Sequence, residues 1–141
     1  MNVRNATYRR FVELGRAPTP AEVAAAVGEP EDLVRASWLR LHDAHALVLD
    51  ETGQLRMANP FAAGPTDFRV DAKGREWYAN CAWDAFGIGA ALRVDSEFET
   101  HCPDCGEMLK VRVRDGRPDD TNLIFHVLVP AARWWNDIGF T

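Results

Sequence analysis

Proline and glycine residues divide the first third of the chain into three short helical segments, and this division constrains the fold most strongly. The first segment ends at Pro18. Residues 19–22, Thr-Pro-Ala-Glu, form a capping box with proline at the first helical position. Gly28 ends this second segment, and Pro30 opens the third. Apolar side chains follow a helical period in the first segment, at Tyr8, Phe11, Val12 and Leu14.

Two short apolar runs, residues 46–49 and 54–57, follow the third helix and flank the sequence Asp-Glu-Thr-Gly, which is typical of a hairpin turn. Three helices and a hairpin predict a winged-helix-like region over residues 1–58. Residues 59–65 are rich in proline, glycine and alanine and predict a linker. The second part of the chain then covers residues 66–141.

The charge distribution argues against DNA binding through this region. The third helix, residues 31–43, carries three acidic residues against two arginines, and the net charge of the whole chain is −5. Phosphate contacts require positive charge, so a winged helix used as a scaffold is the better interpretation. We also expect no membrane span, because no run of about 18 apolar residues exists. The N-terminus lacks the apolar stretch of a secretion signal, which predicts a cytoplasmic protein.

The second part mixes strand and helix patterns, and the predicted fold class is therefore α+β. We expect a small mixed-strand core with one central helix, over residues 76–90, that carries Cys81 and Asp84. A short helical turn is predicted at residues 131–136, after a polar loop at 114–121. Strands are predicted at residues 68–70, 91–95, 98–101, 108–113 and 123–129.

Cys81 and Asp84 form the first candidate for chemistry. On a helix, residues three apart share a face, so a thiol and a carboxylate become neighbours in an aromatic-rich setting. Thiolates bind soft metals, and a carboxyl group that shares a proton with the thiol could also transfer it. The alternative is a buried cysteine that acts as a small hydrophobe, with an aspartate that faces water.

The sequence His-Cys-Pro-Asp-Cys-Gly over residues 101–106 is the second candidate. Cys102 and Cys105 have the spacing of half a zinc site, but structural zinc needs four ligands. His101, Cys81 or His126 would have to complete the set. The alternative is a tight turn built from proline, aspartate and glycine. The three cysteines give no disulfide framework.

Aromatic residues could wall a dry pocket around the thiol, or they could be ordinary core. They are Trp77, Tyr78, Trp83, Phe86, Trp134 and Trp135.

Taken together, these motifs resemble the organomercurial lyase (alkylmercury lyase) family. The family has a winged-helix-like N-terminal region and a core helix with the pattern Tyr-Ala-x-Cys-Ala-x-Asp, which residues 78–84 match. Its Ser/Thr-His-Cys stretch is matched by Thr100, His101 and Cys102. The resemblance runs in order from about Pro18 onward.

The resemblance implies protonolysis of a carbon–mercury bond, which gives a hydrocarbon and Hg(II). Cys81 would be the first mercury ligand and Asp84 the proton carrier, whereas Cys102 matches a family cysteine of structural character. No organic cofactor is implied, free thiols would be co-reactants, and a thiol compound or a mercuric reductase would accept the Hg(II). Such an enzyme would contribute to mercury resistance.

The family's second catalytic cysteine has no counterpart in this chain. Aligned through Val129 and Pro130, it falls just past Thr141, which predicts either a chain cut short of the site or a variant that lacks this cysteine. Cys105 could stand in for it if the Cys102 turn reaches Cys81. The rival hypothesis is a non-catalytic metal-binding or sensing module in which Cys81, Cys102 and Cys105 hold zinc or mercury. Zinc at Cys102 and Cys105 belongs to this alternative.

Overall fold

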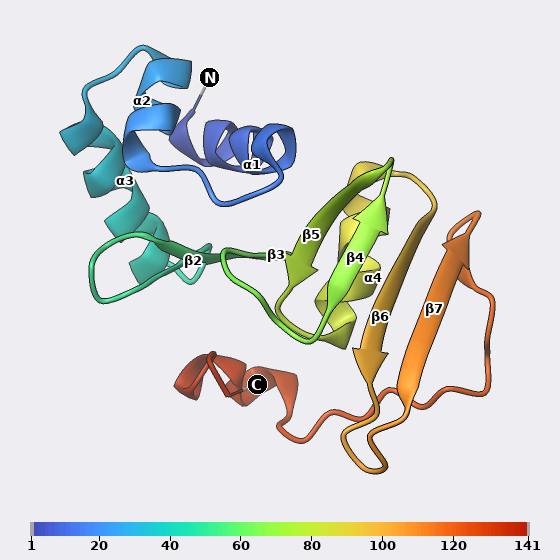
Figure 1. Cartoon of the computed structure of the whole chain (residues 1–141). Coiled ribbons are helices and arrows are strands. Elements are labelled where there is room, and N and C mark those ends of the chain that lie inside the picture. The colour runs from blue at the N-terminus through green and yellow to red at the C-terminus, as the bar shows by residue number, and fades with distance from the viewer. Residues whose placement is uncertain (1, 141) are drawn as a thin grey trace.

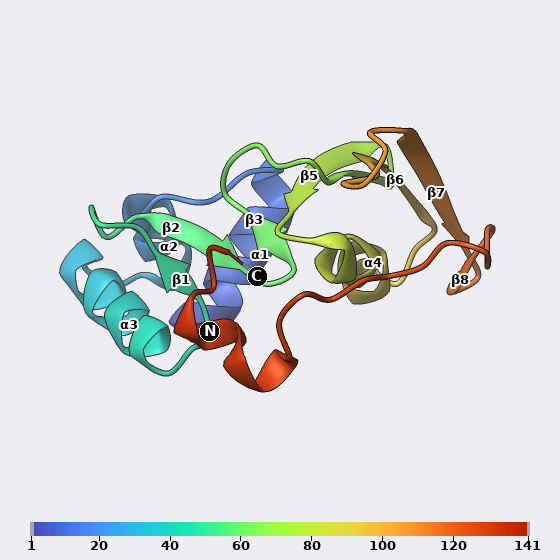
Figure 2. The ribbon, with the colours of Figure 1, turned by 90° about the horizontal axis from the view of Figure 1, so that it is seen from below.

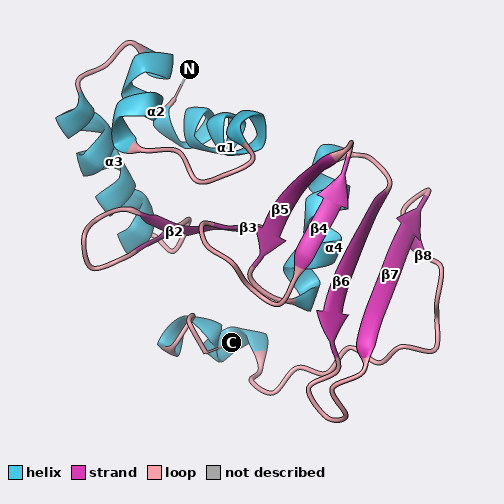
Figure 3. Cartoon of the chain, viewed as in Figure 1, coloured by secondary structure: helices cyan, strands magenta, loops and turns pink. Residues whose placement is uncertain are grey.

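A three-helix cluster packs beside one antiparallel sheet in the computed structural model, which describes residues 2–140 (Figure 1). The helices are α1 Val3–Leu14, α2 Pro20–Val27, α3 Glu31–Asp43 and α4 Ala82–Leu92, with one 3-10 helix, η1 Ala131–Asn136. The strands are β1 Val48–Leu49, β2 Leu55–Ala58, β3 Phe61–Ala62, β4 Arg69–Ala72, β5 Arg75–Ala79, β6 Ser96–His101, β7 Met108–Arg114 and β8 Arg117–Pro118. Figure 3 shows the predicted α+β class directly.

Helices α2 and α3 begin and end where the sequence predicts, whereas α1 ends at Leu14, before the predicted end at Pro18, because Gly15 adopts the left-handed conformation. Thr19 caps α2, and Glu22 completes the capping box by accepting a hydrogen bond from the Thr19 amide. Gly28 ends α2 in the left-handed conformation, with φ +73°. Inside the cluster, Trp38 Nε1 donates a hydrogen bond to Thr7 Oγ1 at 2.8 Å, which satisfies both polar groups in the interior. Strands β1 and β2 then form the predicted hairpin; its assignment to a winged helix stays a prediction.

The eight strands form one sheet in the order β1-β2-β3-β5-β4-β6-β7-β8, and every neighbouring pair is antiparallel. Strand β3 lies within residues 59–65, the predicted linker, and pairs with both β2 and β5. The sheet is therefore continuous from the N-terminal hairpin to β8. The division into units 1–58 and 66–141 stays a prediction.

Two predicted elements around the central helix were wrong. Residues 75–79 form β5. Trp77 and Ala79 are buried while Tyr78 between them is not, which is the alternation of a strand, and the strand pairs with a neighbour on both sides. The helix begins only at Ala82, so Cys81 precedes it. At the other end, α4 continues to Leu92, where the sequence predicted a strand over 91–95.

Helix α4 lies across one face of β4, β5 and β6 (Figure 1). Gly89 allows this contact: a Cβ atom there would lie 2.3 Å from Ser96 Oγ and 2.9 Å from Ser96 Cβ. Gly87 is less restricted, because its Cβ would lie 3.1 Å from Pro60 Cβ. Glycine weakens an isolated helix, but at these two positions it leaves room for Ser96 and Pro60 to pack against α4.

One hydrophobic core joins the helical cluster to the sheet. Phe61 of β3 is 2% exposed and stacks on Phe11 of α1, with ring centroids 5.1 Å apart. Its other neighbour is Trp77 of β5, with centroids 6.2 Å apart. Arg75 adds a hydrogen bond from Nη1 to the Glu13 carbonyl at 2.6 Å. The predicted linker is thus part of the core.

The C-terminal segment turns back beneath the sheet toward the N-terminal hairpin (Figure 2). The strand predicted at residues 123–129 was wrong: this stretch has no regular structure and exposes Ile124 and Leu128. The predicted helical turn at 131–136 is confirmed as η1. Its Trp135 stacks on His45, with ring centroids 4.3 Å apart. Among residues 2–140, no helix combines the length and apolar character that a membrane crossing requires.

Candidate active site

Cys81 lies at the junction between β5 and α4, as the N-cap residue of the helix. Its backbone is extended, with φ −155° and ψ −179°. The first amides of a helix have no partner within it and point toward the N-cap side chain. Here the amides of Trp83 and Asp84 face the Cys81 sulfur. The half-buried thiol is therefore held by helix geometry, although it does not belong to the helix.

Asp84 is the third residue of α4, and its side chain is buried, with the residue 9% exposed. Cys81 and Asp84 occupy the N-cap and third positions, the two positions of a capping box, so both side chains lie at the helix start, where the Asp84 charge acts on the Cys81 thiol. Cys81 and Asp84 are therefore close, as predicted, but because both lie at the helix start and not because they share a helical face. Asn80 Nδ2 donates a hydrogen bond to Asp84 Oδ2 at 2.9 Å.

Both chemical groups favour their protonated forms. Burial raises the pKa of the Asp84 carboxyl, and the hydrogen bond from Asn80 only partly opposes this. Burial also raises the pKa of the Cys81 thiol; the amide of Asp84 opposes this shift, and the charge of Asp84 adds to it. The two groups thus share an electrostatic environment, in which ionisation of one disfavours ionisation of the other. The site therefore holds a proton to higher pH than an exposed carboxyl group would.

Asn80 connects this pair to the β2–β3 loop, which sequence reasoning missed. Besides Asp84, its Nδ2 reaches Asn59 Oδ1 at 3.2 Å and the Pro60 carbonyl at 3.5 Å. Its Oδ1 is buried and has no hydrogen-bond partner among the described residues. The only signal in the sequence was its position directly before Cys81, because the partners at 59 and 60 are twenty residues away.

Cys102 and Cys105 lie together in the turn between β6 and β7. Their thiols interact directly, and the amides of Asp104 and Cys105 face the Cys102 sulfur. These amides, with the Cys105 thiol, lower the pKa of Cys102. Both thiols are at least partly exposed. The two parts of the predicted cysteine set therefore differ: burial raises the pKa of the half-buried Cys81 thiol, whereas neighbouring amides lower the pKa of Cys102.

The family model for alkylmercury lyase matches residues 61–141, which include every cysteine and Asp84. This match covers more than half of the chain. The chain belongs to the alkylmercury lyase family. Among solved structures, the crystal structure of the mercury-bound form of MerB2 resembles it with a TM-score of 0.67 and 21% identity. That comparison supports the same fold.

The chain described here spans 58% of the MerB2 chain, with 84% of its own residues aligned. No curated protein gave a significant sequence match. The family resemblance drawn from the Tyr-Ala-x-Cys-Ala-x-Asp and Thr-His-Cys motifs is confirmed.

The structure brings the predicted site residues together in two separate pairs. Cys81 lies with Asp84, and Cys102 lies with Cys105. Within residues 2–140, no group of three or more His, Cys, Asp or Glu side chains is arranged to hold a metal ion. The candidate ligands His101 and His126 therefore do not complete a zinc site with the cysteines there.

The aromatic set does not gather around the thiol. Trp77 is core, at 3% exposure, whereas Trp83 is 63% exposed. The Trp83 ring lies 6.2 Å from Phe125, a residue of the C-terminal segment, and Phe86 packs edge-on against Phe98. Trp83 therefore contacts the C-terminal segment, whereas Phe86 contacts β6.

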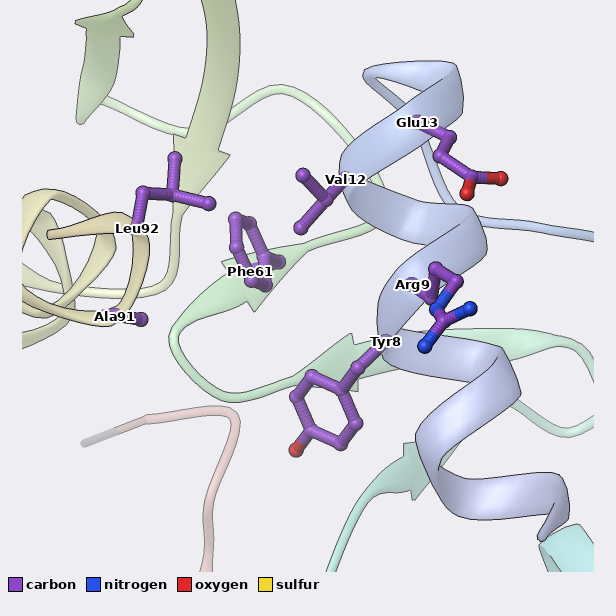
Figure 4. Close-up of a pocket in the computed structure, with 7 residues that line it drawn as sticks. All are labelled: Tyr8, Arg9, Val12, Glu13, Phe61, Ala91 and Leu92. Atoms are coloured by element: carbon purple, nitrogen blue, oxygen red, sulfur yellow. The ribbon is translucent and has the colours of Figure 1, made fainter. Parts of the chain in front are cut away.

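A cavity of about 370 Å³ lies between α1, β3 and the last turn of α4 (Figure 4). Tyr8, Val12, Phe61 and Leu92 give it an apolar wall. It is not lined by Cys81 or Asp84, which lie at the opposite end of α4. The candidate site at the start of α4 is therefore separate from this cavity.

Proposed function

We propose that this chain is an organomercurial lyase that cleaves a carbon–mercury bond by protonolysis, with Cys81 as the mercury ligand and Asp84 as the proton donor. Membership of the alkylmercury lyase family supports the reaction class. The observation that carries the assignment of roles is the buried Asp84 carboxyl beside Cys81, with its pKa raised by burial. General acids work best when they still hold their proton near the operating pH.

In this proposal, the organomercurial first exchanges its thiol ligand for Cys81. The Cys81 sulfur binds mercury, the bond to the small thiol breaks, and the proton of Cys81 passes to the departing sulfur, so Asp84 keeps its own proton. Sulfur is the preferred ligand of a soft ion such as mercury, and donation from sulfur makes the mercury-bound carbon more basic. The protonated Asp84 then transfers its proton to that carbon, the carbon–mercury bond breaks, and the hydrocarbon leaves. Hg(II) stays on sulfur, and Asp84 is left as a carboxylate.

A second sulfur must complete the coordination of Hg(II). Free small thiols supply it in this proposal, and a thiol compound or a mercuric reductase then accepts the ion. A cytoplasmic location, with its abundant thiols, fits this requirement. Asn80 keeps the Asp84 carboxyl oriented through its 2.9 Å hydrogen bond, so that the acid is aimed before substrate arrives.

The test is hydrocarbon release from a phenylmercury compound in excess small thiol, followed as benzene by gas chromatography. We expect Cys81→Ser to abolish release, and Asp84→Asn to lower the rate by about 10²–10⁴-fold, the contribution of a positioned general acid. Asp43→Asn is the matched control, because Asp43 is exposed at the end of α3. It should release benzene at the wild-type rate.

Equal rates for wild type and Cys81→Ser would overturn the proposal. The rival hypothesis, a thiol-based metal-binding module, predicts a different pattern. A simple binder should keep mercury with full occupancy in Asp84→Asn and release no benzene in any variant.

A further inference from the structure

The turn between β6 and β7 holds two thiols in a fixed geometry that the proposed lyase reaction does not use. The Cys102 amide donates a hydrogen bond to the Glu107 carbonyl at 2.8 Å, and the Gly106 amide donates to the Cys102 carbonyl at 2.8 Å. Gly106 adopts φ +73°, which a glycine tolerates without strain. The turn is thereby closed on both sides, and Cys102 and Cys105 are held on it.

The two sulfurs face each other, and backbone amides face one of them. The thiol of Cys105 interacts with Cys102, and the amides of Asp104 and Cys105 point at the Cys102 sulfur. Such N–H groups stabilise a thiolate and leave its remaining lone pairs for a metal ion. Both residues are accessible from solvent. The turn therefore offers a preformed, open pair of sulfur ligands.

The number of ligands selects the kind of ion. Zinc requires four protein ligands in a structural site, and among the described residues no third His, Cys, Asp or Glu side chain is grouped with this pair so as to hold a metal ion. A soft ion that is satisfied by two sulfurs in a linear arrangement, as Hg(II) is, needs nothing more. We propose that Cys102 and Cys105 form a second site, which binds inorganic Hg(II) and receives it after release from Cys81.

The sheet register places Cys81 and the Cys102–Cys105 turn at the same end of the sheet, with one strand between them. Tyr78 of β5 pairs with Arg69 of β4, which pairs with Glu99 of β6. Strands β5 and β6 run in the same direction and end at the same end of the sheet (Figure 1). Cys81 comes three residues after Tyr78, and Cys102 comes three residues after Glu99. One strand lies between β5 and β6, so the strand ends are about 10 Å apart. This spacing separates two sites while keeping transfer between them local.

Transfer between the sites is a ligand exchange without oxidation or reduction. Hg(II) arrives bound to Cys81 and to one small thiol. Two mercury–sulfur bonds form, to Cys102 and Cys105, and the bonds to Cys81 and the small thiol break. The protons that Cys102 and Cys105 lose are taken up by the two departing sulfurs. The Cys81 thiol is then free for another substrate. This transfer rests on the proposed function, whereas binding at the turn can be measured without it.

Binding is tested with inorganic Hg(II) on the full chain carrying Cys81→Ser, in excess 2-mercaptoethanol. We expect native mass spectrometry to show one mercury per chain, with the loss of two protons. Adding Cys102→Ser or Cys105→Ser should weaken retention about 100-fold or more, because two linked ligands exceed one by an effective-concentration factor of about 10²–10⁴. Equal retention in these variants, mercury bridging two chains, or stoichiometric zinc at the turn would each overturn the proposal.

The transfer is tested by alkylating the wild-type chain after one equivalent of Hg(II), and locating the modified cysteine by peptide mapping. We expect Cys81 to be alkylated and the turn cysteines to be protected; with Cys102→Ser and Cys105→Ser together, Cys81 should become the protected residue. Protection of Cys81 in the wild type would overturn the transfer. Since no organomercurial is used, a failure here is distinct from a lack of benzene release.

Discussion

At the scale of single residues, the site depends on a carboxyl group whose environment was not visible in its motif. Spacing alone indicated that Cys81 and Asp84 are neighbours. It could not indicate that Asp84 is 9% exposed or that Asn80 holds it. Burial depends on what α4 packs against, and the Asn80 contacts at residues 59 and 60 join distant parts of the chain. The proximity of the two groups was thus predictable from the sequence, but the burial and hydrogen bonding that shift the Asp84 pKa were not.

Asn80→Ala should raise the pKa of Asp84 further, because the hydrogen bond from Asn80 is the interaction that lowers it. The acid form would then persist to higher pH, and the alkaline fall in the benzene-release rate that belongs to Asp84 would move upward. Carboxyl-carbon NMR of Asp84 measures the pKa directly. Asn59→Ala is the control, since it leaves the Asn80–Asp84 bond in place. An unchanged Asp84 pKa in Asn80→Ala would show that Asn80 has no positioning role.

Asp84→Asn should make the protein more stable at neutral pH, even as activity falls. The folded-state pKa of Asp84 is raised by burial, so its favourable contribution is complete below the ordinary value near 3.8 and is lost as pH rises through the folded pKa. Asparagine has no such loss. Urea unfolding of both proteins at pH 4 and pH 8 should show a stability gain that is larger at pH 8. A gain that is independent of pH would contradict the raised pKa.

At the scale of elements, local signals predicted those whose boundaries are set by caps and turns. Helices α2 and α3 and the β1–β2 hairpin have capping residues or turn residues at their ends. Strand β5 was mistaken for helix because its aromatic run also fits a helical period; pairing with β3 and β4 decides it. Residues 123–129 have the apolar residues of a strand but no strand to pair with. Tertiary pairing, and not propensity, separates these cases.

Gly89→Ala should destabilise the fold by about 1–3 kcal/mol, although alanine favours helices, because the new Cβ would lie 2.3 Å from Ser96 Oγ and overpack the α4–β6 contact. Gly87→Ala is the matched control on the same helix, with its nearest contact at 3.1 Å, and should cost less. Chemical denaturation measures both. Ser96→Gly should restore much of the lost stability. Equal effects at residues 87 and 89 would contradict the packing argument.

At the scale of the whole molecule, the predicted boundary between two parts coincides with a buried contact between them. Residues 59–65 have the composition of a linker, yet they contain Phe61, which lies between Phe11 of α1 and Trp77 of β5. The proline, glycine and alanine content of residues 59–65 indicates how flexible the isolated segment would be, but it does not indicate which residues pack against it. This placement also bears on the site, because the same loop supplies Asn59 and Pro60 to Asn80. The helical cluster therefore packs against β3, and the loop before β3 contacts Asn80 beside the start of α4.

Phe61→Ala should destabilise the helical cluster and the sheet together, by about 3–5 kcal/mol, because truncating a buried phenylalanine leaves a cavity in a core that both share. Hydrogen exchange can follow the two parts separately, with amides of α3 reporting the cluster and amides of β6 reporting the sheet. We expect both sets to lose protection by the same free energy. Phe140→Ala is the control, since Phe140 is 70% exposed, and it should leave both sets unchanged. Loss of protection in only one set would mean that the cluster and the sheet unfold independently, and the stability of the site would then not depend on the N-terminal helices.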